Sequence, residues 1–412
     1  MKSVDAGGTK GKLKNLSEVE LRIAAMAYLM GDLNLTQGEA WAKLEPIFRR
    51  VRPVAVEDER KARRNGWLIT RFAEERFTPE LLKKIKMTAH LFSYKGKGYS
   101  YEDLQRKLQG HSDGVLANLR VYLSDEDVGW DTRLEDFGYR AAEYLWELLT
   151  TRGAAAVGVT WGHTLASVVG GIESHVNQVK KHRRAHGSVE VIPTTGEPLG
   201  TSRYPERSST SLSERLSAVL NSEHKPVLSL RGVPPVIPQE FKSKKGERKI
   251  LLDFIQHLRS YKEIFVEGSN GKRPWVEHID TIVTSVGSFH SWLEFNNELV
   301  TIGGVSREDL QQSCLGDVGG VLIPNPRPEF NVNEFNEIAS LWTGIQRKDF
   351  QRIASQAKDL GRPGVIVVAA GENKKAIVFE LVKQKLVNEL IVDQALAAAL
   401  ADECQIRTKL GN

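Results

Sequence analysis

Four short polar segments carry residue types that can hold a ligand, and each follows or interrupts an apolar stretch of the kind that forms a strand. We call each of these segments a corner, meaning the place where a strand ends and the chain turns toward the next element. The first corner is GVTWGHTL, in which Gly162 and Thr164 stand at the start of an expected helix. Backbone N–H groups and a hydroxyl at a helix start can bind an anion such as phosphate. The second corner is PTTG, which brings Thr194, Thr195 and Gly196 to the end of the next strand.

The third corner combines SVGS, which holds Gly287 and Ser288, with GDVGG, which holds Asp317. Glycines let a ligand approach the backbone, and a carboxylate accepts hydrogen bonds from sugar hydroxyls. The fourth corner is AAGENKKA, a glycine turn that delivers Lys374 to a helix start. Ligands of open parallel sheets bind where strands end and helices begin, so four such corners predict one binding site.

The elements that must position these corners alternate along the chain. The expected strands are 117–123, 154–159, 188–193, 226–230, 279–286, 365–369 and 387–391, and the expected helices are 101–108, 134–150, 164–172, 210–220, 248–258, 306–312, 374–384 and 393–401. Alternation of helices with apolar strands such as GVIVVAA predicts an α/β fold with a mostly parallel sheet flanked by helices.

Composition excludes several other classes of protein. The chain has 412 residues, of which 41% are hydrophobic and 26% charged, so it is a folded protein of more than one domain. Only two cysteines, Cys314 and Cys404, are present, which excludes a disulfide framework and a cysteine zinc site. No run approaches 18 apolar residues and the first residues lack a signal-peptide core, so a cytoplasmic protein without a membrane partner is expected.

No cofactor or metal is expected. His182 and His186 have the i,i+4 spacing of a metal pair, yet the segment lacks the glutamate of HExxH. Trp161 and Trp292 can stack on a sugar ring, although both are also typical core residues.

Positive charge is concentrated near the N-terminus. Residues 46–72 carry eight Lys or Arg against three acidic residues, an excess equal to the net charge of +5 of the whole chain. Three short helices are expected here, from Ser17, from Thr36 and from Pro53, and the third is basic. This pattern predicts an all-α helix-turn-helix domain, with a small bundle carrying solvated charges as the alternative.

The runs VGVTWGHTL, VIPTTG, DTIVTSVGS, CLGDVGGVL and VVAAGENKKA resemble the effector domain of the SorC family of bacterial sugar-responsive transcriptional regulators, over about residues 100–402. The resemblance implies the fold of glucosamine-6-phosphate deaminase and ribose-5-phosphate isomerase, with a sugar or sugar phosphate bound at the C-terminal ends of the strands. It implies that the first corner meets the anionic end of the ligand and that the second forms the facing loop. Asp317 would bind hydroxyls and Lys374 would supply positive charge, while His163 stands where the family often has Arg or Lys.

The segments LTQGEAWAKL and RPVAVEDERKARRNG resemble the DNA-binding half of the same family, except that Glu57, Asp58 and Glu59 occupy a helix that is normally polar or basic. Carboxylates repel phosphates but can accept a hydrogen bond from cytosine. The residues expected to contact DNA are Thr36, Gln37, Arg52, Glu57, Arg60, Lys61, Arg63 and Arg64.

These patterns predict a tail at 1–16, a helix-turn-helix domain at 17–75, a helical linker at 76–115 and a sugar-binding domain at 116–412. The function expected is that of a regulator, not an enzyme, that oligomerises as a dimer or tetramer and binds a double-stranded operator. An effector that binds one quaternary arrangement better would shift the population and alter DNA binding. The alternatives are a sugar-phosphate isomerase or deaminase using Asp317, Glu372 and Asp393, and a sugar sensor that no longer binds DNA.

The basic helix generates the first testable prediction. Replacing Arg60 and Lys61 by Ala should lower both DNA affinity and its salt dependence, because each neutralised phosphate contributes about 0.9 log units per log unit of salt. Replacing Glu57 by Gln should relax specificity if the carboxylate binds cytosine, or tighten binding to all sequences if it only repels phosphate. Titrations of DNA upstream of the protein's own gene, at several salt concentrations, measure these effects. Absent or salt-insensitive binding by the unmodified protein, with and without candidate sugars, would contradict the prediction.

Overall fold

The computed structural model describes residues 101–122, 129–179, 189–197, 205–221, 225–241, 245–268, 271–289, 294–327 and 331–406. The chain divides into two units, and nearly all of these residues belong to the second, Leu104–Ile406. The expected helix-turn-helix domain, its DNA-binding residues and the N-terminal tail lie outside the described residues. Among the described helices, none is long and apolar enough to cross a membrane.

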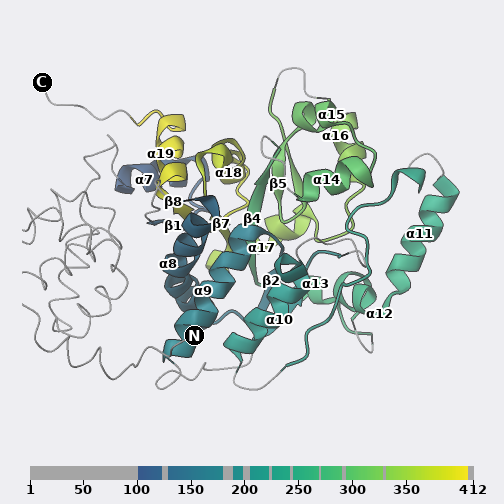
Figure 1. Cartoon of the computed structure of the whole chain (residues 1–412), viewed down its shortest axis with the longest axis horizontal. Coiled ribbons are helices and arrows are strands. Elements are labelled where there is room, and N and C mark those ends of the chain that lie inside the picture. The colour runs from purple at the N-terminus through teal and green to yellow at the C-terminus, as the bar shows by residue number, and fades with distance from the viewer. Residues whose placement is uncertain are drawn as a thin grey trace, which may run out of the picture. The chain divides into compact units, whose positions relative to one another are not determined.

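Six strands of the second unit form a parallel sheet in the order β1-β8-β7-β4-β2-β3 (Figure 1). Their bounds are β1 (Asn118–Tyr122), β2 (Ala156–Val159), β3 (Glu190–Pro193), β4 (Thr281–Ser288), β7 (Gly364–Ala369) and β8 (Glu389–Asp393). Every pairing along this order is parallel. All residues of β2, β7 and β8 are buried, as expected of strands covered on both faces. The expected α/β architecture is confirmed for this part of the chain.

An antiparallel hairpin extends the sheet from β4 and was not expected from the sequence. It consists of β5 (Cys314–Val318) and β6 (Val321–Pro324). Gly319 and Gly320 form its two-residue turn with φ values of 56° and 92°, a conformation in which glycine carries no steric cost. The strand expected at 226–230 is wrong: those residues are not a strand, and only an isolated bridge joins Arg231 to Glu197.

Helices occupy most of the remaining described chain. The long ones are α7 (Tyr101–His111), α8 (Trp130–Thr151), α9 (His163–Val179), α10 (Ser209–Leu220), α11 (Lys245–His257), α17 (Arg347–Leu360), α18 (Lys375–Lys383) and α19 (Gln394–Glu403). The short ones are α12 (Arg259–Tyr261), α13 (Trp275–His278), α14 (Glu294–Thr301), α15 (Arg307–Ser313), α16 (Val332–Ala339), η1 (Pro205–Arg207), η2 (Gln239–Phe241), η3 (Lys262–Val266) and η5 (Glu372–Lys374). The helices expected within the described residues are present. The helices α14, α16 and α17 were not predicted, and of these α17 packs on β7 and β4.

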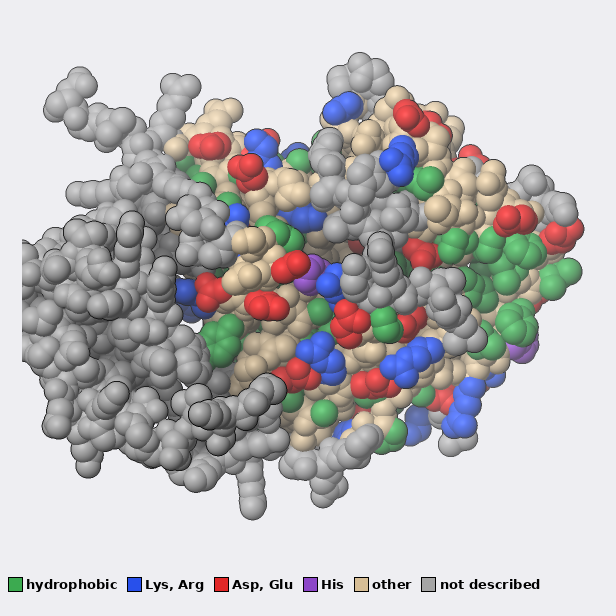
Figure 2. All heavy atoms as spheres, viewed as in Figure 1, with side chains coloured by type: hydrophobic (Ala, Val, Ile, Leu, Met, Phe, Trp, Pro, Cys, Tyr) green, Lys and Arg blue, Asp and Glu red, His purple; other side chains and the backbone are tan. Residues whose placement is uncertain are grey.

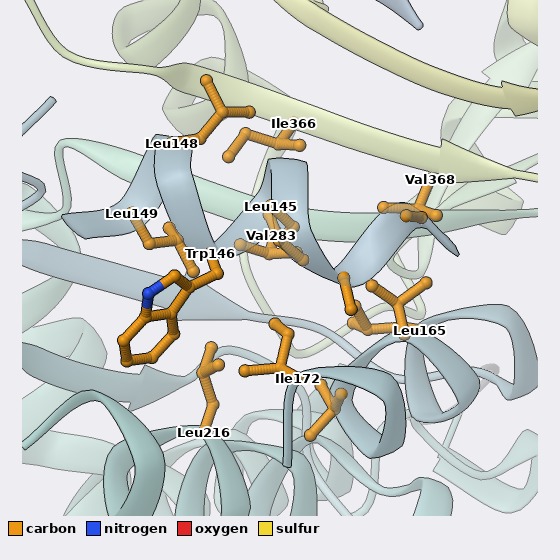
Figure 3. Packing of buried hydrophobic residues seen from close by; sticks show 14 of the residues in the cluster. Leu145, Trp146, Leu148, Leu149, Leu165, Ile172, Leu216, Val283, Ile366 and Val368 are labelled. Carbon is orange, nitrogen blue, oxygen red and sulfur yellow. The ribbon is translucent and has the colours of Figure 1, made fainter. Parts of the chain in front are cut away.

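The main core lies between α8, α9, α10 and the centre of the sheet (Figure 3). It is built from apolar side chains of these elements, labelled in the figure as Leu145, Trp146, Leu148, Leu149, Leu165, Ile172, Leu216, Val283, Ile366 and Val368. Because α9 begins directly after β2, this packing fixes where the first corner leaves the sheet.

Close contact between α8 and α9 depends on glycine. A Cβ at Gly171 would lie 2.5 Å from the carbonyl oxygen of Gly138, and a Cβ at Gly138 would lie 2.5 Å from the backbone of Ser167. Both obstacles are backbone atoms, which cannot rotate away. The neighbouring Gly170 differs, because its nearest neighbour would be the end of the Arg215 side chain at 3.4 Å.

This difference between adjacent glycines gives a stability prediction. Gly171→Ala should lower the free energy of unfolding by about 1–3 kcal/mol, because the added methyl forces α8 and α9 apart. Gly170→Ala is the matched control and should be neutral or stabilising by up to about 1 kcal/mol, through better helix propensity. Urea unfolding of the two variants measures both values. Equal stability of the two variants would contradict the packing argument.

Candidate functional site

The expected corners meet at one edge of the sheet. β4 lies between β2 and β7, and β3 lies beside β2, so the first, second and fourth corners follow the carboxyl ends of parallel strands. The third corner joins them because β5 pairs with the last residues of β4. The first and fourth corners do not end adjacent strands, because β4 lies between β2 and β7.

At the first corner the chain passes close over β4. Gly162 has a φ of 125°, and a Cβ at this position would collide with the Ser285 hydroxyl. That hydroxyl donates a hydrogen bond to the Trp161 carbonyl at 3.0 Å. Thr164 lies half-buried in the first turn of α9, and Trp161 packs against Trp342 with ring centroids 6.0 Å apart. A glycine is therefore required where α9 begins.

The second corner is used mainly for the fold. Thr194 is fully buried, and its hydroxyl donates to the Val159 carbonyl at 2.9 Å. Ser209 Oγ accepts from the backbone N–H groups of Thr194 (2.8 Å) and Thr195 (3.3 Å). A Cβ at Gly196 would collide with the Val233 carbonyl, so this glycine faces protein backbone. The Thr195 hydroxyl is different, because it is buried and has no hydrogen-bond partner in the described part of the chain.

Asp317 is the centre of the third corner. It lies opposite Gly287 in the antiparallel pairing of β4 and β5, and Ser288 lies opposite Gly316. A Cβ at Gly287 would collide with Asp317 Oδ1, so the missing side chain makes room for the carboxylate. Asp317 Oδ2 accepts a hydrogen bond from the Gly320 N–H at 2.8 Å. The hairpin turn therefore fixes the orientation of a buried carboxylate.

Lys374 of the fourth corner is the basic counterpart of Asp317. Its side chain is buried at the end of η5, and its backbone N–H donates to the Gly371 carbonyl at 3.1 Å. Burial lowers the pKa of Lys374 to about 8, although the charge of Asp317 acts in the opposite direction and raises it. Burial raises the pKa of Asp317 to about 6, against the hydrogen bond from Gly320 and the charge of Lys374. Among the described residues, no carboxylate lies within 4 Å of the Lys374 ammonium, so the two groups attract each other without forming an ion pair.

Arg207, which lies near the first corner, was not expected from the sequence. The Arg207 carbonyl accepts a hydrogen bond from the Gly162 N–H at 3.1 Å. The pKa of His163 is lowered mainly by burial and secondly by the positive charge of Arg207. Arg207 thus places a guanidinium beside the helix start where the sequence carries only His163. Arg207 lies 45 residues after Gly162, in a segment without a regular pattern, so the sequence does not indicate that the two residues are close.

The start of α8 links the first and fourth corners. Asp131 Oδ1 lies 3.9 Å from His163 Nε2. Its neighbour Trp130 lies against the turn before Lys374, 3.3 Å from where a Cβ of Gly371 would be. One helix end therefore contacts both corners.

The other two carboxylates considered as proton carriers, Asp393 and Glu372, lie in different surroundings. Asp393 is fully buried and accepts from Arg133 (2.9 Å) and from the backbone N–H groups of Gly371 and Leu396 (3.0 Å each), so it is a structural carboxylate. Glu372 is exposed. No cluster of three potential metal ligands occurs within the described ranges, and His182, His186 and Trp292 lie outside them.

Comparison with known proteins identifies the fold. No family model and no curated protein sequence matches the chain. A probable sor operon regulator from Shigella flexneri matches with a TM-score of 0.50 and 16% identity, over 73% of this chain and 99% of that one. The full-length sorbitol operon regulator SorC from Klebsiella pneumoniae matches with a TM-score of 0.49 and 15% identity, over 89% of this chain and 97% of that one. The expected resemblance to these regulators is confirmed at the level of the fold.

The raised pKa of Asp317 should make the free energy of unfolding fall as pH rises. Because the folded protein holds the Asp317 proton up to about pH 6 while an unfolded aspartate loses it near 3.8, stability should fall as pH rises from about 4 to 6. Asp317→Asn removes this loss, so its stability relative to the unmodified protein should increase by about 1–3 kcal/mol over that interval. Thermal or urea unfolding at pH 4, 5, 6 and 7 measures the difference. Parallel pH profiles for the two proteins would contradict the burial of an ionisable Asp317.

Proposed function

We propose that this protein is a transcriptional regulator that binds DNA through residues 17–75 and a sugar or sugar phosphate through the domain at 116–412. The observation that carries the proposal is the buried pair of Asp317 and Lys374 at the carboxyl edge of the sheet. The shared fold with the probable sor operon regulator and the sequence resemblance support the same function.

A buried ammonium without an ion pair is costly, and a ligand can offset this cost. Sugar hydroxyls can donate to Asp317 and accept from Lys374, so one polyol can satisfy both groups. The unpartnered Thr195 hydroxyl offers a further donor and acceptor near the neighbouring strand end. Together these groups fit a ligand with several hydroxyls better than a flat or apolar one.

The first corner supplies a different kind of contact. The start of α9, a helix of 17 residues, presents backbone N–H groups. The Arg207 guanidinium is near enough to lower the pKa of His163, and it also lies 3.5 Å from the Glu206 carboxylate. This combination favours a phosphate or carboxylate. We therefore expect the anionic end of a phosphorylated ligand here and its hydroxyls toward Asp317.

Ligand affinities of the variants Lys374→Ala and Lys375→Ala test the proposed site. Lys374→Ala should weaken binding of an anionic sugar about 10- to 150-fold, since a hydrogen bond to a charged group is worth about 1.5–3 kcal/mol. Lys375→Ala is the matched control, because the Lys375 side chain is exposed and lies 3.9 Å from the Glu403 carboxylate. This variant should bind the ligand as the unmodified protein does. A thermal-shift screen with sugars and sugar phosphates identifies the ligand, and calorimetry with that ligand measures the affinities.

The same experiment distinguishes phosphorylated from neutral ligands. Arg207→Gln should weaken a sugar phosphate and leave the corresponding neutral sugar unchanged. Absence of any stabilising sugar or sugar phosphate, or equal affinities for the Lys374 and Lys375 variants, would contradict the proposed site.

One observation favours a second candidate function. A carboxyl with a pKa of about 6 near an amine with a pKa of about 8 can exchange protons at neutral pH, as an isomerase or deaminase requires. Turnover of the bound sugar phosphate by the unmodified protein, lost in Asp317→Asn, would establish the enzyme. Binding without turnover supports the regulator, and binding without any DNA affinity would leave a sensor that no longer contacts DNA.

A further inference from the structure

Trp342, which lies between α16 and α17, belongs to a second core cluster. This cluster includes Leu310 of α15, Leu322 of the hairpin and Ile338 of α16, and it is distinct from the main core between α8, α9, α10 and the sheet. Figure 2 shows apolar side chains gathered on the surface where Figure 1 places α11, whereas Trp342 is only 6% exposed. The contacts of its indole ring are therefore made inside the domain.

The outer edge of the Trp342 ring lies against the turn that orients Asp317. A Cβ at Gly320 would collide with the ring atoms Cη2, Cζ2 and Cζ3, so the ring contacts the glycine backbone directly. The N–H of the same glycine donates the 2.8 Å hydrogen bond to Asp317 Oδ2. At the other residue of the turn, a Cβ at Gly319 would collide with Thr160. Contacts with Thr160 and with Trp342 therefore hold the two-residue turn in place.

The same indole reaches the first and second corners. The ring centroids of Trp161 and Trp342 are 6.0 Å apart. Trp342 Nε1 donates to the Ile345 carbonyl at 2.8 Å, and the Ile345 N–H donates to the Thr194 carbonyl at 3.0 Å. A Cβ at Gly344 would lie 2.5 Å from Trp342 Cζ2 and 2.8 Å from the Thr194 carbonyl oxygen. One side chain thus contacts three of the four corners, directly or through its chain neighbours.

We propose that Trp342 is a positioning residue of the candidate site, which holds the turn at Gly320 and thereby fixes the Asp317 carboxylate. Tryptophan suits this role better than a smaller apolar residue. The contacts with Gly320 and Gly344 are made by outer atoms of the six-membered ring, which a phenylalanine is too short to reach. The buried indole N–H also requires an acceptor, and the Ile345 carbonyl supplies it.

The importance of this contact for sugar binding rests on the proposed function, whereas its effect on the carboxylate can be measured without a sugar. Burial raises the pKa of Asp317 to about 6. When the ring is shortened, the turn loses a contact and water can reach the carboxylate, so its pKa should fall toward the usual 3.8. Two neighbouring groups do not titrate between pH 4 and 6, because the pKa of Lys374 is about 8 and that of Cys314 is about 12.

Urea unfolding of Trp342→Phe at pH 4, 5 and 6 tests the proposed role. In the unmodified protein the free energy of unfolding should fall over this interval, because the folded state holds the Asp317 proton and the unfolded state does not. Trp342→Phe should lose most of that fall, so the destabilisation that it causes should become smaller as pH rises. A destabilisation that is constant or grows with pH overturns the proposal.

Two controls separate positioning from packing. Ile338→Ala removes apolar contacts from the same core cluster, and its destabilisation should be the same at every pH. In an Asp317→Asn background the destabilisation by Trp342→Phe should also be independent of pH, since no carboxylate remains at this position. This background removes any contribution of Glu334, whose charge acts on Cys314. A destabilisation that shrinks with pH in either control overturns the proposal.

Gly320→Ala disturbs the same contact from the other side and supplies the test if Trp342→Phe does not fold. The added Cβ would collide with the ring, and alanine rarely adopts the φ of 92° found here. Its destabilisation should likewise become smaller between pH 4 and 6, and the absence of this decrease overturns the proposal. Failure of every sugar in the thermal-shift screen would contradict the proposed function and leave these pH profiles unchanged.

Discussion

The position of the Asp317 carboxylate depends on a register of antiparallel strands, and the candidate site depends on that carboxylate. β5 pairs with the last residues of β4 so that Asp317 lies opposite Gly287, whose missing side chain leaves room for it. The hairpin turn then directs the Gly320 N–H to one carboxylate oxygen. A shift of one residue would place Asp317 on the other face of the hairpin and leave Lys374 without a facing charge.

β4 connects this interaction to the rest of the edge. The Ser285 hydroxyl donates to the Trp161 carbonyl at the first corner. Thr284 accepts a hydrogen bond at 2.9 Å from Thr160, which directly follows β2. β7, which leads to Lys374, pairs with the other side of β4. The first, third and fourth corners are thus attached to β4 by short-range contacts. A ligand that moves one of these corners must therefore displace part of a packed sheet.

Much of this fold could be predicted from the sequence because its signals are local. Alternating apolar strands and amphipathic helices identified the parallel sheet and most of its helices. The hairpin was missed because the glycines of CLGDVGGVL were interpreted as a ligand loop, although Gly319 and Gly320 are there to make a tight turn. The segment VLSL near 226–230 has the composition of a strand but does not pair with a strand of the sheet. Helix α17 was missed, although the capping box of Gln346 and Asp349 marks its start.

The site could be predicted less fully because its contacts join distant parts of the chain. Thr194 and Gly196 have the residue types of a ligand loop, yet buried contacts with Val159 and Val233 occupy them. Arg207 could not be foreseen, since only the tertiary fold brings it to the first corner.

Its position has a consequence for the ligand under the proposed function. A guanidinium and a helix start attract an anion at one end of the site, while the Asp317 carboxylate repels it at the other. Opposite preferences at the two ends should allow a phosphorylated sugar to bind in one orientation only, with its hydroxyls between Asp317 and Lys374.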